Sequence, residues 1–493
     1  MDYSQVFNMV PECSLMVILL LTFIADFASA HNAERRWLNP LVCVMMLAHL
    51  LLNIMPTAEA TAFGGMYHTD ASIGVIKTIL ALGALIVLIQ SRQWMLRKDT
   101  FFKEGEFYVL VVSTLLGMNM MVSAGNFLMF YLGLEMASVP MACLVGIDKY
   151  RHNSAEAAAK FVLTATFSSG VMLFGISFLY GATGSLYFSG VVNALTSLFA
   201  GAPCTLSVGL VVMGMVFFFS GLAFKISLVP FHFWTADTYQ GAPTTVTGYL
   251  SVVSKGAAAF TLMALLMKVF APMFVYWQTM LSVVVILSIT IANLFAIRQS
   301  DLKRFMAFSS ISQAGYIMLA VIGNSAQAVT ALSYYVLIYV VANMAVFTII
   351  SAVEENNGGR TDIDAYDGFY TTNPKLAFLM TLALFSLGGI PPFAGMFSKF
   401  FVFMAAMEQG SNAAVGTMAY VTVFVALINT VVSLYYYLLI VKAMFIKKTE
   451  TPLPTFQSDF NTKLALALCI AGVVLFGVAS PIYGWISNAA MSF

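Results

Sequence analysis

Long apolar runs, separated by short polar segments, make up most of this chain. A helix that crosses a bilayer needs about 20 mostly apolar residues, and runs of that kind occur about fourteen times. The predicted spans are residues 11–30, 39–57, 72–91, 106–122, 125–146, 157–181, 205–230, 244–269, 273–297, 302–323, 328–353, 375–404, 413–446 and 463–488. The largest polar segment, Glu354 to Asn373, is too short for a soluble domain. We therefore predict an all-α polytopic membrane protein.

Composition supports this prediction. The 493 residues are 60% hydrophobic and only 9% charged, whereas a soluble protein carries about 25% charged residues. The net charge of +1 gives no reason to expect a nucleic-acid partner. The five cysteines occur singly, without the spacing of a metal site. The sequence has no P-loop, dinucleotide fingerprint or haem motif, so we expect no cofactor bound to this chain.

The distribution of basic residues predicts how the chain is oriented. Lys and Arg concentrate in cytoplasmic loops. If the N-terminus faces outward, 18 of the 23 Lys and Arg lie in inner loops. Two others, Lys77 and Lys268, fall on the outer side near helix ends, and the last three lie inside spans. We therefore expect both termini on the outer side of the membrane.

Four charged residues lie inside the apolar runs: Glu135, Lys225, Lys255 and Lys399. Each costs about 2.5–3.5 kcal/mol on insertion scales. Structural ion pairs could account for Glu135 and one lysine, but the only other candidate acid, Asp26, lies close to a span end. A buried lysine can gain or lose a proton near neutral pH, whereas arginine stays charged. Three lysines and no arginine therefore favour a proton relay.

Two of these lysines accompany predicted helix breaks. In SGLAFKISLVPFHFW, Lys225 stands five residues before Pro230, and in GGIPPFAGMFSKFFVF, Lys399 follows Pro391 and Pro392. Proline frees a backbone carbonyl, which a membrane helix tolerates beside protein or a wet cavity. Broken spans often mark ion sites near the bilayer midplane. A packing kink with a lysine reaching the surface is the simpler alternative, but apolar residues flank Lys399 on both sides.

The two breaks are five spans apart, which predicts an internal repeat. Residues 106–270 would form one five-helix unit and residues 271–448 a second, each with the broken helix in fourth place. An odd number of spans inverts the second unit in the membrane, as in secondary transporters. A three-helix segment, 1–105, would precede these units and a single helix, 449–493, would follow them.

Further polar residues could support a relay. His232 follows the first break, where it could extend the relay or serve as a hydrogen-bonded structural histidine. The stretch DLKRFMAFSSISQAGY places four polar side chains roughly on one helical face: Ser309, Ser312, Gln313 and Tyr316. These could hold water between charged sites or form hydrogen bonds between helices.

Three stretches resemble the antiporter-like membrane subunits of respiratory complex I, NADH:quinone oxidoreductase. They are FKISLVPFHFWTADTYQGAPTTVTGYLSVVSK, DLKRFMAFSSISQAGY and GNFLMFYLGLEMASVPMACLVG, and the resemblance extends over nearly the whole chain. It implies a proton-translocating subunit of the bacterial inner membrane that makes no bonds itself. NADH, FMN, iron–sulfur clusters and quinone would belong to partner subunits, and K-type and M-type subunits would be its neighbours.

The resemblance also implies roles for single residues. Glu135 matches the glutamate that pairs with the lysine of the first broken helix, here Lys225. Lys255 matches the central lysine, and Lys399 matches the residue that exchanges protons with the outer side. The M-type sister carries glutamate at that last position and the L-type sister ends in a long lateral helix, so this sequence favours neither. Gln313 stands where relatives often have histidine, which leaves it a water-holding role.

One close alternative shares the same charged set, namely the D-type membrane protein of the multi-subunit sodium/proton antiporters. A membrane-bound hydrogenase subunit is a weaker alternative, and the intact charged positions argue against a purely structural scaffold. Sodium would favour a cluster of carboxylates and carbonyls. Glu135 is the one deeply buried carboxylate expected here, so protons are favoured.

Overall fold

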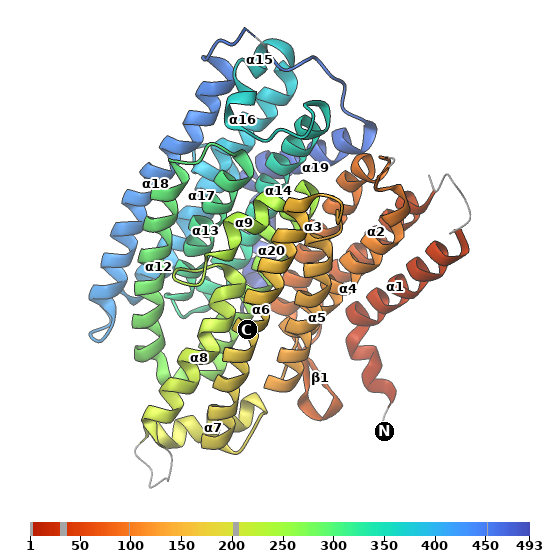
Figure 1. Ribbon diagram of the computed structural model, residues 1–493. Helices are drawn as coiled ribbons and strands as arrows, with labels where there is room; N and C mark the ends of the chain where they lie inside the picture. Colours follow the sequence, from red (N-terminus) through yellow and green to blue (C-terminus); the bar gives the residue numbers. More distant parts are fainter. Residues whose placement is uncertain (1–2, 30–36, 98, 201–206, 451) are drawn as a thin grey trace.

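The computed structural model describes residues 3–29, 37–97, 99–200, 207–450 and 452–493, and three of the predicted inner-loop charges, Arg35, Arg36 and Lys98, lie outside this range. Long helices lie side by side between two ends of the molecule (Figure 1). One end carries the short helix α15 (Phe369–Thr372) and the other carries strand β1 (Ala60–Ala62). We refer to them as the α15 end and the β1 end.

The chain begins with three helices and a small hairpin. These elements are η1 (Tyr3–Met9), α1 (Val10–Ser29), α2 (Leu38–Ile54), β1, η2 (Phe63–Gly65), β2 (Tyr67–Thr69) and α3 (Ala71–Met95). Strands β1 and β2 pair antiparallel with Thr61 opposite His68. The side chain of Asp70 caps α3 by accepting a hydrogen bond from the Ile73 N–H, which satisfies one free donor of the first turn.

A first series of helices follows. Its elements are η3 (Phe101–Lys103), α4 (Glu104–Val122), α5 (Phe127–Val145), α6 (His152–Thr183), α7 (Phe188–Phe199), α8 (Val208–Ile226), α9 (Trp234–Gly241), α10 (Thr244–Tyr249), η4 (Leu250–Ser254), α11 (Lys255–Ala264), η5 (Leu265–Val269) and η6 (Ala271–Met273). Helices α8 and α9 are the halves of the first broken span. Segments η4 and η5 are π-helical turns that interrupt the span containing Lys255.

A second series has the same order. Its elements are α12 (Phe274–Ala296), α13 (Leu302–Val321), α14 (Ala326–Asn356), η7 (Ile363–Tyr366), α15, α16 (Pro374–Gly388), α17 (Ala394–Met407), η8 (Glu408–Ser411) and α18 (Gly416–Phe445). Helices α16 and α17 are the halves of the second broken span. The chain ends with α19 (Phe460–Val478) and α20 (Ser480–Ala490).

Matching backbone contacts relate the two series. Before α5, the Phe127 N–H donates to Leu186 O and the Phe188 N–H donates to Gly125 O. Before α13, the corresponding bonds run from Leu302 to Thr361 and from Ile363 to Ser300, and each residue follows its counterpart by 175 positions. The caps match as well, because Asn126 caps α5 and Asp301 caps α13. In each series, the start of the second helix (α5 or α13) is therefore hydrogen-bonded to the segment that follows the third helix (α6 or α14).

Helices α3 and α14 occupy the interior of the bundle. In each, 94% of the most apolar window is buried, compared with 28% in the first span. Figure 1 shows α14 between α18 on one side and α1 on the other. Exposed apolar side chains such as Phe23 on α1 and Phe424 on α18 cover the periphery, which suits a surface in contact with lipid.

The fold class predicted from the sequence is confirmed. Within the described residues, 11 helices are long and apolar enough to cross a membrane. The remaining predicted spans correspond to α2, to α13 and to the broken pair α16–α17. Helix α13 is long enough to cross a membrane, but it is less apolar than the others because it carries polar residues, among them Lys303, Arg304 and Gln313.

Three details of the prediction were wrong or incomplete. The last span is two helices, because α19 ends at Val478 and α20 begins at Ser480 with Pro481 in its first turn, where proline cannot continue the preceding hydrogen-bond ladder. Helix α7 was not predicted. It buries only Val191 and Leu195 and is too short to span a bilayer. The β1–β2 hairpin, with three residues in each strand, also escaped prediction.

Candidate functional site

Lys225 lies at the end of α8, where the first broken span begins. The helix ends at Ile226 because Ser227 adopts a left-handed conformation with φ 68°, before the predicted break at Pro230. The Lys225 ammonium donates a hydrogen bond to Ser138 Oγ at 2.7 Å. Ser138 lies one turn after Glu135 on α5, and the Glu135 carboxylate attracts Lys225 electrostatically. Within the described part of the chain, no direct ion pair joins Glu135 and Lys225.

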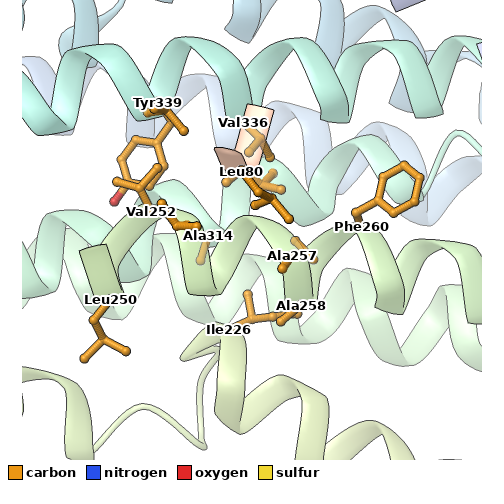
Figure 2. Close-up of a cluster of buried hydrophobic side chains, with 14 of the residues drawn as sticks. Leu80, Ile226, Leu250, Val252, Ala257, Ala258, Phe260, Ala314, Val336 and Tyr339 are labelled. Atoms are coloured by element: carbon orange, nitrogen blue, oxygen red, sulfur yellow. The ribbon is translucent and has the colours of Figure 1, made fainter. Parts of the chain in front are cut away.

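Lys255 lies where the π-helical turn η4 passes into α11. Its ammonium donates to Ser310 Oγ at 2.7 Å and lies 5.3 Å from the centre of the Tyr239 ring. The Tyr239 hydroxyl is 3.2 Å from the same Ser310 oxygen. Figure 2 shows the apolar side chains that enclose this helix, among them Leu80 and Val336. Lys255 therefore has neutral polar partners in an otherwise apolar surrounding.

Lys399 lies on α17, after the second break. Helix α16 ends at Gly388 because Gly389 adopts φ 83°, a conformation that favours glycine. The break leaves the Gly388 carbonyl free to accept a hydrogen bond from the Lys399 ammonium at 3.1 Å. The ammonium also lies 5.0 Å from the centre of the Tyr316 ring. A small cavity lies beside it, lined in part by Gln313 and Tyr335.

Helix α13 connects the surroundings of Lys255 and Lys399. Ser310 accepts from Lys255, and Gln313, three residues later, lines the cavity at Lys399. Gln313 Nε2 donates to Leu387 O at 3.2 Å and to Tyr437 Oη at 3.1 Å, and Tyr335 donates to Gln313 Oε1. The polar residues of α13 therefore lie between the two lysines, and no described hydrogen bond joins Ser310 to Gln313 or Gln313 to Lys399.

Of the four charged residues predicted for the site, the three lysines are buried and no more than 5% exposed, whereas Glu135 is only partly buried. Of the supporting residues, Gln313 and Tyr316 approach Lys399, and Ser309 contacts Tyr437 Oη at 2.5 Å. Ser312 and His232 are buried, and no described hydrogen bond joins either to a relay lysine, although the charge of Lys255 acts on His232. The His232 ring lies against Phe233 instead.

Sequence reasoning missed the direct partners of the lysines. Ser138, Ser310 and Tyr239 each contact a lysine or its acceptor, yet no local pattern distinguishes them from other polar residues. The repeat offers one signal, because Ser310 follows Glu135 by the same 175 positions that relate the two series. In the second unit, a serine thus occupies the place that the glutamate has in the first.

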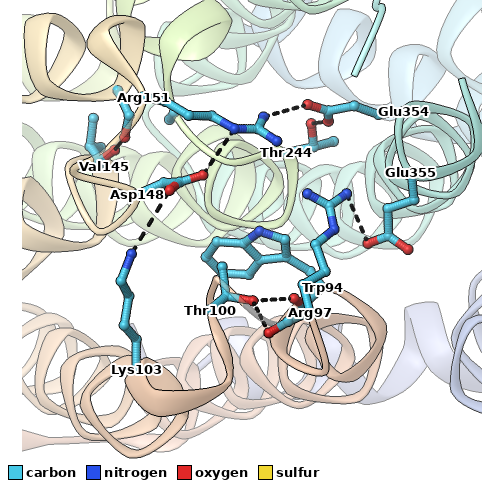
Figure 3. A network of polar contacts seen from close by, with 12 residues as sticks. Trp94, Arg97, Thr100, Lys103, Val145, Asp148, Arg151, Thr244, Glu354 and Glu355 are labelled. Carbon is cyan, nitrogen blue, oxygen red and sulfur yellow. Dashed lines mark hydrogen bonds and ion pairs between the residues drawn. The ribbon is translucent and has the colours of Figure 1, made fainter. Parts of the chain in front are cut away.

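A charged network lies at the α15 end, near the start of α10 (Figure 3). Arg151 contacts Asp148 at 3.2 Å and Glu354 at 3.6 Å, and Lys103 contacts Asp148 at 3.8 Å. Thr244 donates a hydrogen bond to Glu354. A polar cavity of about 330 Å³ borders these residues. The network ties η3, the segment between α5 and α6, α10 and α14 together on one side of the relay.

A second polar cluster lies at the β1 end, around Asp70 just before α3. Burial alone would raise the pKa of Asp70, but hydrogen bonds from His68, Ser72 and the Ile73 N–H, together with the charge of Lys268, hold that pKa well below its usual range. Because the pKa is lower in the folded state, the stabilisation is present above about pH 4 and is lost as the pH falls through the folded pKa.

A buried ion pair joins the first helices. The Lys77 ammonium contacts the Glu12 carboxylate at 2.7 Å, and both side chains are only 1% exposed. Tyr67 bridges the pair, accepting from Lys77 at 3.0 Å and donating to Glu12 at 3.0 Å. The sequence analysis placed Lys77 on the outer side near a helix end and gave no indication of this buried pair. Lys77 lies inside α3 and is enclosed by α1 and β2.

No cluster of His, Cys, Asp and Glu among the described residues has the arrangement of a metal site. The polar groups around the two broken helices are instead lysines, a glutamate, serines, tyrosines and a glutamine. Such groups can take up, hold and pass protons. The two broken helices and the buried lysines thus define an antiporter-like membrane subunit.

Comparison with known proteins agrees with this class. Residues 124–428 match the family described as NADH:quinone oxidoreductase/Mrp antiporter, transmembrane. Over its whole length, the chain is 54% identical to NADH-quinone oxidoreductase subunit N of Phocaeicola vulgatus, and all of that protein is covered. It is 46% identical to the protein of the same name from Azobacteroides pseudotrichonymphae, with 99% of this chain and 98% of that one covered. The chain belongs to this family, as its sequence predicted.

Solved structures show the same fold. A chain of respiratory complex I from Thermus thermophilus with bound aureothin is 30% identical, with a TM-score of 0.76 and coverage of 97% of this chain and 99% of that chain. A chain of the Mrp complex from Dietzia has a TM-score of 0.82 at 18% identity, over 98% of this chain and 97% of that chain. At that identity, the second likeness concerns the fold alone.

Proposed function

We propose that this chain is the N-type membrane subunit of a bacterial NADH:quinone oxidoreductase and that it translocates protons through a buried glutamate–lysine relay. The identity to two proteins named subunit N, over full length, supports the assignment to this enzyme. Electron transfer from NADH to quinone takes place in partner subunits, which hold FMN, the iron–sulfur clusters and quinone. This chain contributes the movement of protons.

The relay runs through the charged residues in chain order. Glu135 adjusts the charge of Lys225 across α5 and α8. Lys255 receives the proton at the centre and passes it along α13 toward Lys399. Lys399 then releases it to the outer side of the membrane. Each transfer moves a proton between nitrogen and oxygen atoms and breaks no other bond.

The contact between Lys255 and Ser310 carries this proposal. It joins the central lysine of the first unit to a helix of the second unit at 2.7 Å. Gln313 and Tyr316 on that helix lie beside Lys399. A line of polar groups therefore extends from one unit to the other through an apolar interior, as a relay across the repeat boundary requires.

The wider setting of the chain belongs to the same proposal. Both termini would face the periplasm, and K-type and M-type subunits would be the neighbours in the inner membrane. Residues 106–270 and 271–448 would form the two inverted units, between an N-terminal segment, 1–105, and a C-terminal segment, 449–493. The matched contacts before α5 and α13 support this division.

Replacement of Lys399 by alanine tests the proposal. We expect the K399A enzyme to assemble normally and to lose about tenfold in both NADH-driven quinone reduction and proton uptake, which corresponds to about 1.4 kcal/mol. The coupled loss follows because electron transfer cannot proceed when proton release is blocked. Both rates are measured together on inner-membrane vesicles from a strain carrying the change in its chromosomal copy.

Lys448, an exposed lysine beyond α18, provides the control, since K448A should leave both rates unchanged. A different outcome would favour the sodium/proton antiporter. If K399A leaves NADH oxidation and proton uptake intact while the strain loses sodium tolerance, the chain is not a complex I subunit.

Ser310 provides a second, milder prediction. The S310A change removes the acceptor of the Lys255 ammonium, and a hydrogen bond to a charged group contributes about 1.5–3 kcal/mol. We expect a severalfold decrease in proton uptake, measured with a pH-sensitive dye in vesicles. The S310T variant keeps the hydroxyl and should retain most activity. Equal losses in S310A and S310T would show that the hydroxyl is not what Lys255 requires.

A further inference from the structure

A groove of about 740 Å³ lies between α16 and α19, away from the relay. This volume is within the range of known ligand sites. Its walls are mostly apolar and come from both helices: Leu376, Leu379, Leu466, Ala467 and Ile470. Two lysines stand among its lining residues toward the α15 end, Lys375 from α16 and Lys463 from α19. The groove therefore combines an apolar trough with a pair of cations.

Local hydrogen bonds hold the backbone at the end of the groove that carries the two lysines, which we call the rim. Asn373 holds the segment that crosses above α16, since its Nδ2 donates to Pro454 O at 3.1 Å and its Oδ1 accepts from the Phe456 N–H at 3.3 Å. Asp459 accepts hydrogen bonds from the first backbone N–H groups of α19. The nearest carboxylate in sequence to Lys463 is thus engaged in capping its helix.

Neither lysine is neutralised by the protein. Lys375 and Lys463 are both exposed, and within the described range no carboxylate forms an ion pair with either one. By contrast, Lys447 at the same end pairs with Asp364 and Asp367. The two rim lysines are therefore available to an anion from outside the chain.

The groove also opens toward the membrane. Phe378 on α16 and Leu468 on α19 are 54% and 43% exposed, as expected of side chains that face acyl chains. The lysines stand near the first turns of α16 and α19, where a spanning helix reaches the headgroup region. Basic pockets between membrane helices attract anionic headgroups. An occupant needs an apolar tail along the trough and a negative charge at its α15 end.

We propose that this groove binds an anionic phospholipid, with an acyl chain against Leu466 and Ile470 and the phosphate between Lys375 and Lys463. The lipid would occupy the seam between the second unit and the C-terminal helix. This site is separate from the proton relay, so its test does not depend on proton pumping.

Chemical labelling of the two lysines tests the proposal. The assembled enzyme is placed in nanodiscs of phosphatidylcholine with or without added cardiolipin, and an amine-reactive reagent is applied. Peptide mass spectrometry then gives the labelling rate of each lysine. We expect cardiolipin to slow the labelling of Lys375 and Lys463 severalfold and to leave exposed Lys448 unchanged. A tryptophan at Ala467, which lines the groove, should abolish this protection, whereas L468W on the neighbouring face should preserve it.

Several results would overturn the proposal. Equal slowing at Lys448 would indicate a general attraction between the membrane surface and the reagent or the protein. Persistent protection in A467W would show that the groove does not hold the lipid. If neither rim lysine reacts even in phosphatidylcholine, a neighbouring subunit covers the groove.

Discussion

Replacement of Lys255 by methionine is expected to reduce NADH-driven proton uptake by at least about tenfold, or about 1.4 kcal/mol. Lys255 joins the two units of the relay, because its ammonium reaches Ser310 on α13 while its own helix belongs to the first series. Methionine fills a similar volume but carries no proton. The apolar side chains around α11 offer no substitute cation (Figure 2).

Arginine at this position separates a proton-carrying role from a structural one. The K255R change keeps the positive charge and can still donate to Ser310, but arginine does not release its proton in proteins. We therefore expect K255R to fail as K255M does, with normal amounts of assembled enzyme. Proton uptake is measured in vesicles beside NADH-driven quinone reduction.

The control is K268M, thirteen residues further along the chain, where Lys268 is 39% exposed and pairs with Asp70. It should retain most proton uptake. Full activity in K255R would mean that Lys255 contributes only a fixed charge, and the relay would then have to bypass it.

Replacement of Lys77 by methionine is expected to have the largest effect on stability. Removal of one partner of a buried ion pair costs about 3–5 kcal/mol, because the other charge is left without compensation. In K77M that charge is the Glu12 carboxylate, which is enclosed with Tyr67. We expect little assembled enzyme in K77M membranes, as measured on native gels and by the temperature at which the purified enzyme dissociates.

The double variant E12Q/K77M tests the cause. Removal of both charges leaves neither unpaired, so assembly should return toward the wild-type amount. Lys160 provides a matched exposed case, because it pairs with Glu156 and Asp237 at the surface, where an ion pair contributes only about 0–1 kcal/mol. K160M should therefore assemble almost normally. If the double variant is as unstable as K77M, the instability of K77M comes from disturbed packing and not from the unpaired Glu12 charge.

The sequence predicted the helices and the burial of Lys225, Lys255 and Lys399 well, because both depend on local properties. A lysine with apolar residues on both sides, such as Lys255 or Lys399, has no path to water along its own helix. Proline and glycine marked the second break, since Gly389 needs its left-handed conformation. The first break lay slightly earlier than predicted, because Ser227 rather than Pro230 ends α8.

The partners of these charges depend on tertiary packing and could not be predicted. Ser138 donates to Leu134 O in its own helix at 2.7 Å, as serines in membrane helices commonly do, and only the fold brings Lys225 to its oxygen. The pairing of Lys77 could not be predicted for the same reason, because Glu12 is distant in sequence and only the fold brings the two side chains together. The proton-carrying roles of Glu135 and the three lysines remain predictions.

The hydrogen bonds between the two series constrain how transport can occur. Besides Lys255 and Ser310, Asn343 on α14 donates to Ser251 at 2.7 Å, and the Val229 N–H donates to Ser288 on α12 at 2.9 Å. All of these bonds lie in the interior. In transporters that alternate access, one repeat rocks against the other. Such rocking here would leave buried donors without partners, at about 1–3 kcal/mol each. The scaffold therefore favours the movement of charge between side chains on stationary helices over a movement of one series of helices against the other.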